Sequence, residues 1–264
     1  MKSPLKWFGG KSYLAKKIVS LMPPHKRYLE AFAGGLSVLL AKPCEGVSEF
    51  VCDTNGELTN FWRVLAYTPD RMLRALWGTP LSQAEFIASG AANPSDNVMR
   101  ATAFFIRMRQ SRQGLGKDYC TPTSRIRRGM NENVSAWNTV IDGLPEIHER
   151  LRRVEVWFSS AIDAIKKLDR ADLCTYCDPP YLQETRSTFG EYGDHEMIAE
   201  DHYELLECLA SIKGKFLLSG YHSNMYDSFA EERGWRCVEF DLPNNASSGK
   251  KKERKTECVW MNFP

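Results

Sequence analysis

The sequence predicts an α/β protein built on a doubly wound, mostly parallel sheet of seven strands. Seven short apolar segments have the length and residue types of strands, and segments with helical spacing separate most of them. Residues 68–149 show helical segments and loops but no strand pattern, so they are predicted to form an insertion into the sheet domain. Alternating strands and helices favour a parallel sheet with right-handed crossovers.

The first elements alternate regularly along the chain. Apolar residues at helical spacing predict a helix between the Gly9-Gly10 turn and Pro23-Pro24. A strand over 28–32, a glycine turn with a short helix over 34–42, and a second strand over 49–53 are expected to follow. The next helix is indicated by residues spaced i, i+3, i+4 and i+7, which are Leu58, Phe61, Trp62 and Leu65.

Strands resume after the insertion. The remaining five are predicted at 154–158, 173–177, 215–220, 235–242 and 257–263. The last two are joined by a basic loop alone, which suits a terminal antiparallel hairpin. We therefore expect a sheet domain formed by residues 1–67 and 150–264, with a mainly helical inserted subdomain over 68–149.

Composition excludes several classes of protein. The chain of 264 residues is 43% hydrophobic and 26% charged, and no apolar run approaches the ~20 residues of a membrane helix. The basic start is not followed by the apolar core of a signal peptide, so we expect a cytoplasmic protein without a membrane partner. The eight scattered cysteines fit reduced thiols, and the lone Cys174-x-x-Cys177 pair is weak evidence for zinc, so no metal is expected.

Positive charge is concentrated locally. The net charge is only +2, so a polyanion must be held by a patch rather than by the overall field. One basic segment runs from Arg107 to Arg128 with Asp118 as its single acid, and a second, "GKKKERK", covers 249–255. Each segment could instead be a solvated loop.

Two features follow the first two strands. In "EAFAGGLS" the glycines leave backbone N–H groups at a helix N-terminus, where anionic groups bind favourably. Asp53 ends the second strand, where an acid can accept hydrogen bonds from ribose hydroxyls. A tight connection without a ligand is the alternative for the glycine turn.

The segment "DPPY", residues 178–181, follows the fourth strand. Proline cannot donate to a sheet ladder, so the strand is expected to stop at Asp178 and the tetrapeptide to lie at the carboxyl edge where α/β sheets bind ligands. Asp178 and a backbone carbonyl offer two acceptors, and Tyr181 offers a flat stacking surface. Such a pocket suits the exocyclic amino group of a planar base. A proline-rich turn with a surface aspartate is the alternative.

Together these motifs resemble the Dam-like DNA adenine N6-methyltransferases, the D12 class. The resemblance rests on "PLKWFGGK" (4–11), "YLEAFAGGLSV" (28–38), Asp53 and "DPPY" in this order, and it extends from 4 to 263. It implies a Rossmann-like class I methyltransferase fold. Residues 1–67 and 150–264 are then the S-adenosylmethionine-binding catalytic domain, and 68–149 is the target-recognition, DNA-binding subdomain.

The resemblance also implies roles for individual residues. The catalytic loop is Asp178, Pro179, Pro180 and Tyr181. Cofactor binding is expected from Trp7, Gly10, Lys11, Phe32, Ala33, Gly34, Gly35, Asp53, Ser160 and Asp178. Contact with DNA is expected from Lys11, Arg107, Arg109, Arg112, Arg125, Arg127, Arg128, Lys250 and Lys251.

The implied reaction moves a methyl group from S-adenosylmethionine to N6 of an adenine flipped out of double-stranded DNA. Flipping costs a few kcal/mol of unstacking, which stacking on Tyr181 offsets. Asp178 stabilises the positive charge that grows on the attacking nitrogen. No metal is needed. A cognate restriction endonuclease is a possible partner, and a monomer is the default expectation.

Two departures from the family pattern weaken the expected cofactor affinity. The cofactor loop of the family runs F-x-G-x-G, whereas "FAGGL" places Leu36 at the second glycine. Ser160 aligns with an acid that many relatives carry after the third strand, and Asp163 is expected in the next helix. Two alternatives remain open: a cytosine-N4 DNA methyltransferase, and a catalytically silent DNA-binding module that keeps the fold.

Overall fold

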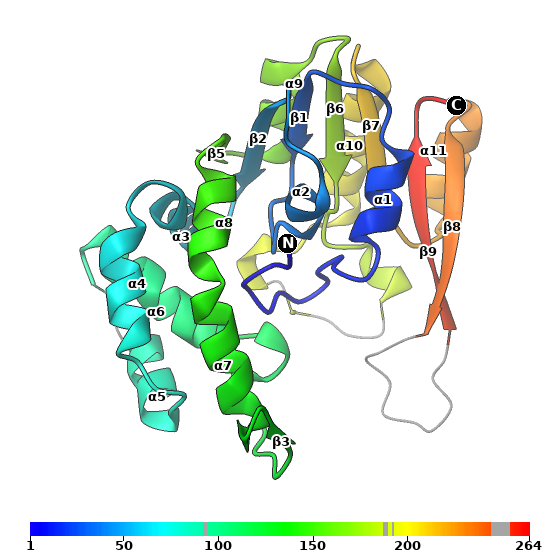
Figure 1. Ribbon diagram of the computed structural model, residues 1–264. Coiled ribbons are helices and arrows are strands. Elements are labelled where there is room, and N and C mark those ends of the chain that lie inside the picture. The colour runs from blue at the N-terminus through cyan, green and yellow to red at the C-terminus, as the bar shows by residue number, and fades with distance from the viewer. Residues whose placement is uncertain (92–93, 187–189, 192, 244–253) are drawn as a thin grey trace. The chain divides into compact units, whose positions relative to one another are not determined.

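The structure is a computed structural model that describes residues 1–91, 94–186, 190–191, 193–243 and 254–264 (Figure 1). The chain divides into two compact units. Unit 1 consists of Met1–Val19, Ala33–Cys44 and Glu49–Phe158. Unit 2 consists of Ser20–Phe32, Glu45–Ser48 and Ser159–Pro264. The predicted division at 68 and 149 stays a prediction.

Seven strands form one mostly parallel sheet, as the sequence predicts. Their order is β5-β2-β1-β6-β7-β9-β8. Strands β2/β5, β1/β6 and β6/β7 pair in parallel, whereas β7/β9 and β8/β9 are antiparallel, which confirms the terminal hairpin. The bounds are β1 (Arg27–Glu30), β2 (Ser48–Asp53), β5 (Val154–Phe158), β6 (Leu173–Cys177), β7 (Lys215–Gly220), β8 (Arg236–Pro243) and β9 (Arg254–Met261).

Unit 1 holds most of the helices. Its elements are α2 (Ser37–Ala41), α3 (Gly56–Tyr67), α4 (Pro69–Trp77), α5 (Gln83–Ala91), α6 (Asn97–Gln110), η1 (Arg112–Gly114), α7 (Glu132–Asp142) and α8 (Leu144–Leu151), and α1 (Ala15–Leu21) contributes residues to both units. Helix α3 begins where the Asn55 side chain accepts hydrogen bonds from the first-turn amides. Its predicted apolar face is fully buried, so hydrophobic burial fixes the helix in place.

A small hairpin corrects the prediction that residues 68–149 contain no strand. Strands β3 (Ile126–Arg127) and β4 (Met130–Asn131) pair antiparallel across a turn in which Arg128 and Gly129 have φ of 53° and 74°. Figure 1 shows this hairpin at the start of α7. The hairpin was missed because all four strand residues are exposed, so no buried face imposes a hydrophobic alternation.

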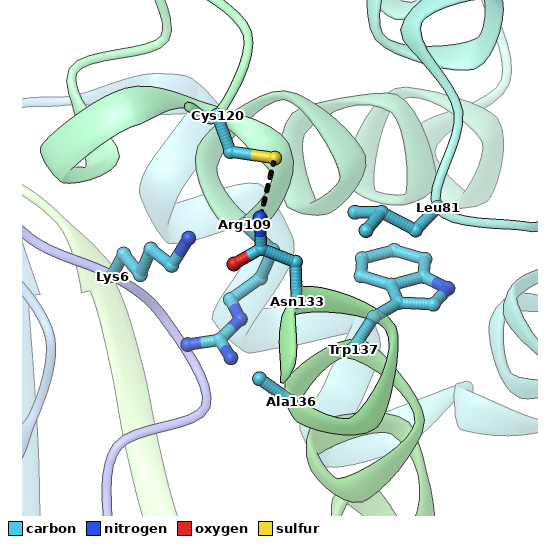
Figure 2. Close-up of a pocket in the computed structure, with 7 residues that line it drawn as sticks. All are labelled: Lys6, Leu81, Arg109, Cys120, Asn133, Ala136 and Trp137. Carbon is cyan, nitrogen blue, oxygen red and sulfur yellow. Dashed lines mark hydrogen bonds between the residues drawn. The ribbon is translucent and has the colours of Figure 1, made fainter. Parts of the chain in front are cut away.

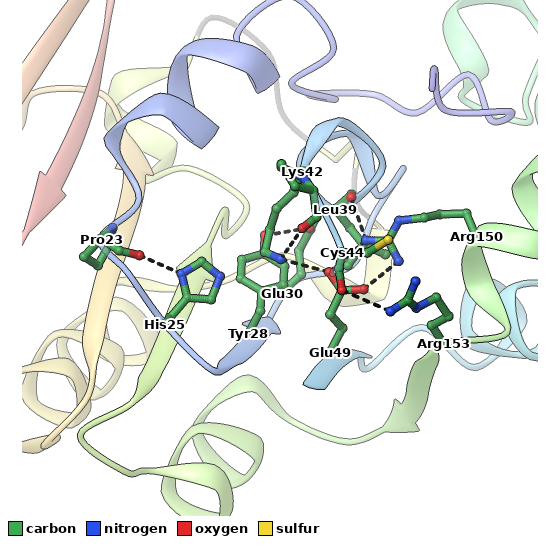
Figure 3. Close-up of polar contacts among 11 residues, drawn as sticks. Pro23, His25, Tyr28, Glu30, Leu39, Lys42, Cys44, Glu49, Arg150 and Arg153 are labelled. Atoms are coloured by element: carbon green, nitrogen blue, oxygen red, sulfur yellow. Dashed lines mark hydrogen bonds and ion pairs between the residues drawn. The ribbon is translucent and has the colours of Figure 1, made fainter. Parts of the chain in front are cut away.

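Unit 1 also contains a buried ion cluster, the Glu49 centre, formed by Glu49, Lys42 and Arg150. Arg150 binds both carboxylate oxygens of Glu49 at 2.5 and 2.8 Å and donates to Leu39 O at 3.1 Å. Lys42 lies 3.0 Å from Glu49 Oε1. Figure 3 shows both cations directed at this carboxylate. The cluster ties the start of β2 to α8 and to the residue that follows α2.

Unit 2 carries η2 (Gln183–Thr185), η3 (Gly193–His195), α9 (Ala161–Leu168), α10 (Ala199–Ser211) and α11 (Asn224–Glu232). Strand β6 is buried at all five positions, and the aromatic core includes Tyr176, Phe216 and Trp260. Among the helices that the structure describes, none has both the length and the apolar character needed to cross a bilayer. The described residues also contain no group of three His, Cys, Asp or Glu side chains suited to a metal ion.

Candidate active site

The glycine turn in unit 1 is closed by the N-terminal segment. Gly34 has φ of +43°, and a Cβ at this position would lie 2.9 Å from Trp7 Nε1. At Gly35 a Cβ would lie 3.2 Å from the Trp7 Cβ. Trp62 of α3 donates from its indole nitrogen to Gly34 O at 3.0 Å. Only glycine fits this close approach, so the turn presents backbone rather than side chains.

Asp53 is bound to the backbone of the same turn. Its Oδ2 accepts a hydrogen bond from Gly34 N at 3.1 Å, and its Oδ1 accepts one from Asn55 N at 2.9 Å. Asp53 pairs with Phe158 at the carboxyl ends of β2 and β5, and Phe158 is 73% exposed. An acid and an open aromatic ring at one sheet edge fit a ribose and a base.

Leu36 keeps the backbone conformation that favours glycine. It has φ of 52° and ψ of 32° at the residue before α2, and its side chain is fully buried. A left-handed conformation costs roughly 1–2 kcal/mol in an ordinary residue. Burial of the leucine offsets part of this cost, so the turn is formed without the second family glycine.

The N-terminal element is compact. Gly10 N donates to Trp7 O at 3.1 Å, and Lys11 Nζ donates to Gly9 O at 2.9 Å. Lys11 is only 5% exposed, although the sequence predicted contacts with both cofactor and DNA. Its ammonium group binds the carbonyl of Gly9, and this hydrogen bond stabilises the turn that follows Trp7.

The DPPY loop lies in unit 2 directly after β6. Strand β6 ends at Cys177, one residue before Asp178, as predicted. Glu30 pairs with Tyr176, and Ala31 N donates to Tyr176 O at 2.9 Å, so β1 and β6 end side by side. Asp178 and Pro180 are half-buried, whereas Pro179 is buried. Phe32, another predicted cofactor residue of this unit, is also half-buried and follows the end of β1.

Tyr181 is held at both its hydroxyl group and its ring. The hydroxyl donates a hydrogen bond to Glu257 Oε1 of β9. The ring meets that of Tyr221 at 80°, with centroids 4.7 Å apart. Burial raises the pKa of Tyr181 well above its ordinary value, and the charges of Asp178 and Glu257 raise it further. The phenol therefore stays protonated and remains a donor at neutral pH.

Ser160 does not stand free to replace the family acid. Its Oγ accepts from Asp163 N at 3.1 Å and donates to Asp163 Oδ2 at 2.7 Å, which caps α9. Asp163 lies in the first turn of α9, as predicted, and is exposed. The hydroxyl and carboxylate at this helix start thus form one bonded pair.

A small pocket in unit 1 brings two cations together. It is lined by Lys6, Leu81, Arg109, Cys120, Asn133, Ala136 and Trp137, and Figure 2 shows the Lys6 and Arg109 side chains directed into it. None of these described lining residues carries a carboxylate. Burial lowers the pKa of Arg109 to about 10, and burial with the nearby Arg109 charge lowers the pKa of Lys6. Two neighbouring cations favour an anion there.

Of the other residues predicted to contact DNA, one arginine packs against a helix and the remaining described arginines are exposed. Arg107 donates to Phe86 O at 3.2 Å and lies over the Phe86 ring, so it packs against α5. Arg112 is exposed and 3.7 Å from Asp118. Arg127 and Arg128 of the hairpin are exposed, as is Arg125, which directly precedes β3. Lys250 and Lys251 lie outside the described residues.

Several residues of these sites were missed from sequence. Glu257, Tyr221, Phe158 and Lys6 were not singled out, although all four touch or adjoin predicted site residues. Glu257 left little signal, since it is the first residue of the predicted strand 257–263 and directly follows polar residues. Tyr221 had a usable signal, because it follows directly on the predicted strand 215–220, at the edge where ligands bind.

A glycine turn, an acid and a DPPY loop after three strands of a mostly parallel sheet define a Rossmann-like methyltransferase fold. The family model of the D12 class N6 adenine-specific DNA methyltransferases matches residues 7–239. The chain belongs to this family, as its motifs predicted.

Curated relatives of this chain are named as DNA adenine methyltransferases. The Retron Ec67 DNA adenine methylase of Escherichia coli is 25% identical over 221 residues, covering 79% of this chain and 72% of its own. A DNA adenine methylase of Vibrio cholerae is 25% identical over 213 residues, covering 77% and 74%. The DNA N-6-adenine-methyltransferase of Escherichia phage P1 is 25% identical over 216 residues, covering 79% of this chain but 28% of its own.

Proposed function

We propose that this chain transfers a methyl group from S-adenosylmethionine to N6 of an adenine flipped out of double-stranded DNA. The observation that carries the proposal is the DPPY loop at the end of a fully buried strand, with Tyr181 held by buried hydrogen bonding. That strand pairs with β1, from which the chain runs directly into the glycine turn. Ligands of open α/β sheets bind at such carboxyl ends.

The residues of the glycine turn fit S-adenosylmethionine. The backbone at Gly34 leaves no room for a Cβ, Asp53 can accept from ribose hydroxyls, and the exposed Phe158 ring suits a base. When bound, the cofactor supplies an electrophilic methyl group on a sulfonium. Gly34, Asp53 and Phe158 would hold it, with Trp7 buttressing the turn.

Asp178 and Tyr181 act on the target base. Asp178 accepts a hydrogen bond from the adenine amino group and orients its nitrogen. As that nitrogen gives up its lone pair it gains positive charge, and a fixed carboxylate stabilises this charge more in the transition state than in the ground state. Tyr181 stacks on the extruded base and offsets the cost of flipping.

Binding of double-stranded DNA is assigned to the basic residues of unit 1. Exposed arginines at 125, 127 and 128 can neutralise phosphates, and the Lys6–Arg109 pocket has the charge for one more. Exposed Ile126 and Met130 lie on the same hairpin, which gives it apolar as well as cationic contacts. Affinity supplied by these cations should weaken as salt rises.

Transfer of tritiated methyl from S-adenosylmethionine to unmethylated duplex DNA, followed by nucleoside analysis, tests the proposal. We expect N6-methyladenine from the wild type and a loss of roughly 100- to 1000-fold in kcat for Asp178→Ala, because a preorganised electrostatic contact is removed. Glu204→Ala, which removes an exposed carboxylate on α10, is the matched control and should keep the wild-type rate.

The product distinguishes the alternatives. Label in N4-methylcytosine would show that the DPPY loop acts on the amino group of cytosine instead of adenine. A folded protein that retards DNA without labelling it would be a silent binding module, and the proposal would be wrong. Activity that survives Asp178→Ala would remove the DPPY loop from the mechanism.

A further inference from the structure

The buried acid on β9 gives the DPPY loop a partner that its motif does not contain. Glu257 is 2% exposed, and the nearby Tyr181 is 9% exposed. The two residues are 76 positions apart in sequence, and the Tyr181 hydroxyl donates directly to Glu257 Oε1. A buried hydrogen bond to a carboxylate is stronger than one between neutral groups.

Glu257 is fixed by strand pairing on both sides of β9. It pairs with Phe240 of β8, and its neighbour Cys258 pairs with Gly220 at the end of β7. One further position along that register leads from Gly220 to Tyr221, whose ring contacts Tyr181. The hydroxyl of Tyr181 is therefore held by a residue of β9, and its ring contacts the residue that follows the adjacent strand β7.

We propose that Glu257 is a positioning residue for methyl transfer: its carboxylate holds the Tyr181 ring in the orientation that receives the extruded adenine. This inference rests on the proposed function and adds a residue to the same site. Glu257 acts through Tyr181 and touches neither the base nor the methyl group. A rotating Tyr181 ring would offer the base a poorer stacking surface. Loss of Glu257 should therefore destabilise the complex with the flipped-out adenine and leave the affinity for S-adenosylmethionine unchanged.

Four variants test this assignment. Glu257→Leu removes the acceptor, Glu257→Gln keeps an acceptor oxygen, Tyr181→Phe removes the donor, and the double variant Tyr181→Phe/Glu257→Leu removes both. Glu239→Leu on β8 is the matched control, since it removes an exposed acid of the same hairpin. The measurements are kcat and KM for duplex DNA, the Kd for S-adenosylmethionine by calorimetry, and the fluorescence of 2-aminopurine placed at the target adenine.

We expect Glu257→Leu to lower kcat roughly 10-fold and to reduce the 2-aminopurine signal, as loss of one hydrogen bond to a charged group implies. The Kd for S-adenosylmethionine should stay within about twofold of the wild-type value, because no residue of the glycine turn takes part in the Tyr181–Glu257 hydrogen bond. Glu257→Gln should recover most of the rate. The double variant should be no slower than Tyr181→Phe, since both changes break the same contact.

A readout independent of activity completes the test. In protein labelled with 3-fluorotyrosine, the fluorine signal that disappears in Tyr181→Phe reports the ring, and it should sharpen toward rapid averaging in Glu257→Leu. Wild-type kcat and an unchanged fluorine signal in folded Glu257→Leu would overturn the inference. If the wild type transfers no methyl group, the proposed function fails, while the fluorine signal still decides whether Glu257 fixes the ring.

Discussion

Two buried glutamates sit in contrasting surroundings. Glu49, near the start of β2, is bound by Arg150 and Lys42, so its charge is closed within the Glu49 centre. Glu257 of β9, beside the carboxyl end of β7, receives a hydrogen bond from the neutral phenol of Tyr181. The difference teaches that burial alone does not mark a functional acid. A carboxylate saturated by cations stabilises a fold, whereas one that orients a residue of the DPPY loop serves the site.

The largest effect that this comparison predicts is on stability. Arg150→Met leaves Glu49 buried with one cation fewer, and we expect the free energy of unfolding to fall by about 3–5 kcal/mol. Denaturant unfolding measures the loss. The matched control is Arg152→Met, which breaks an exposed pair with Glu149 and should cost at most about 0.5 kcal/mol.

The same variant can also contradict the comparison. At a temperature where folded Arg150→Met persists, its kcat for methyl transfer should equal that of the wild type. A folded Arg150→Met protein with a much lower kcat would show that the Glu49 centre also supports the site, and the contrast between the two glutamates would fail.

A second prediction concerns a neutral polar pair in unit 2. His202 shares a 2.8 Å hydrogen bond with the Tyr226 hydroxyl, and burial lowers the pKa of His202 to about 4. Arg186 lowers it further, whereas Asp201 opposes the shift. The unfolded chain binds the proton near pH 6.5, so between pH 6.5 and 4 the unfolded state holds more protons and stability falls as pH falls.

The magnitude follows from the two pKa values. Between pH 7.5 and 5.0 the wild type should lose about 2 kcal/mol of unfolding free energy through His202, and His202→Gln should lack this component. Urea unfolding at the two pH values measures it. The control is His222→Gln: Asp227 raises the pKa of His222, so its contribution has the opposite sign. Identical pH dependence in His202→Gln and wild type would place the titration elsewhere.

Much of the fold could be predicted because burial leaves a periodic signal. All seven strands of the main sheet occur where apolar segments predicted them, with bounds shifted by at most a few residues, as at β9. The β3–β4 hairpin left no such signal, since its strand residues are exposed. Side-chain burial thus accounts for both the success and the failure.

The positions of the candidate site residues could be predicted only where the residues lie in one motif. Asp178, Tyr181, Gly34 and Asp53 each belong to a local segment at a strand end, and backbone rules placed them. The Tyr181–Glu257 bond joins positions 76 residues apart, so it depends on strand order, which a single sequence does not specify. Arg109 shows the same limit: it was grouped with the surface arginines but lies beside Lys6 in a pocket.

The smallest predicted effect compares two glycines with positive φ. Gly34→Ala and Gly46→Ala both force alanine into the left-handed region, at a cost of roughly 1 kcal/mol each. At Gly46 nothing lies within 4 Å of the new Cβ, whereas at Gly34 the Cβ would meet the Trp7 indole at 2.9 Å. The clash should add about 1 kcal/mol to the loss at Gly34, measured by denaturant unfolding. It should also weaken S-adenosylmethionine binding roughly 10-fold by calorimetry, because the indole that closes the cofactor turn must move. Equal free energies of unfolding and equal affinities for S-adenosylmethionine in the two variants would show that Trp7 moves at no cost. The conformation of the glycine turn would then depend on Asp53 rather than on the packed indole.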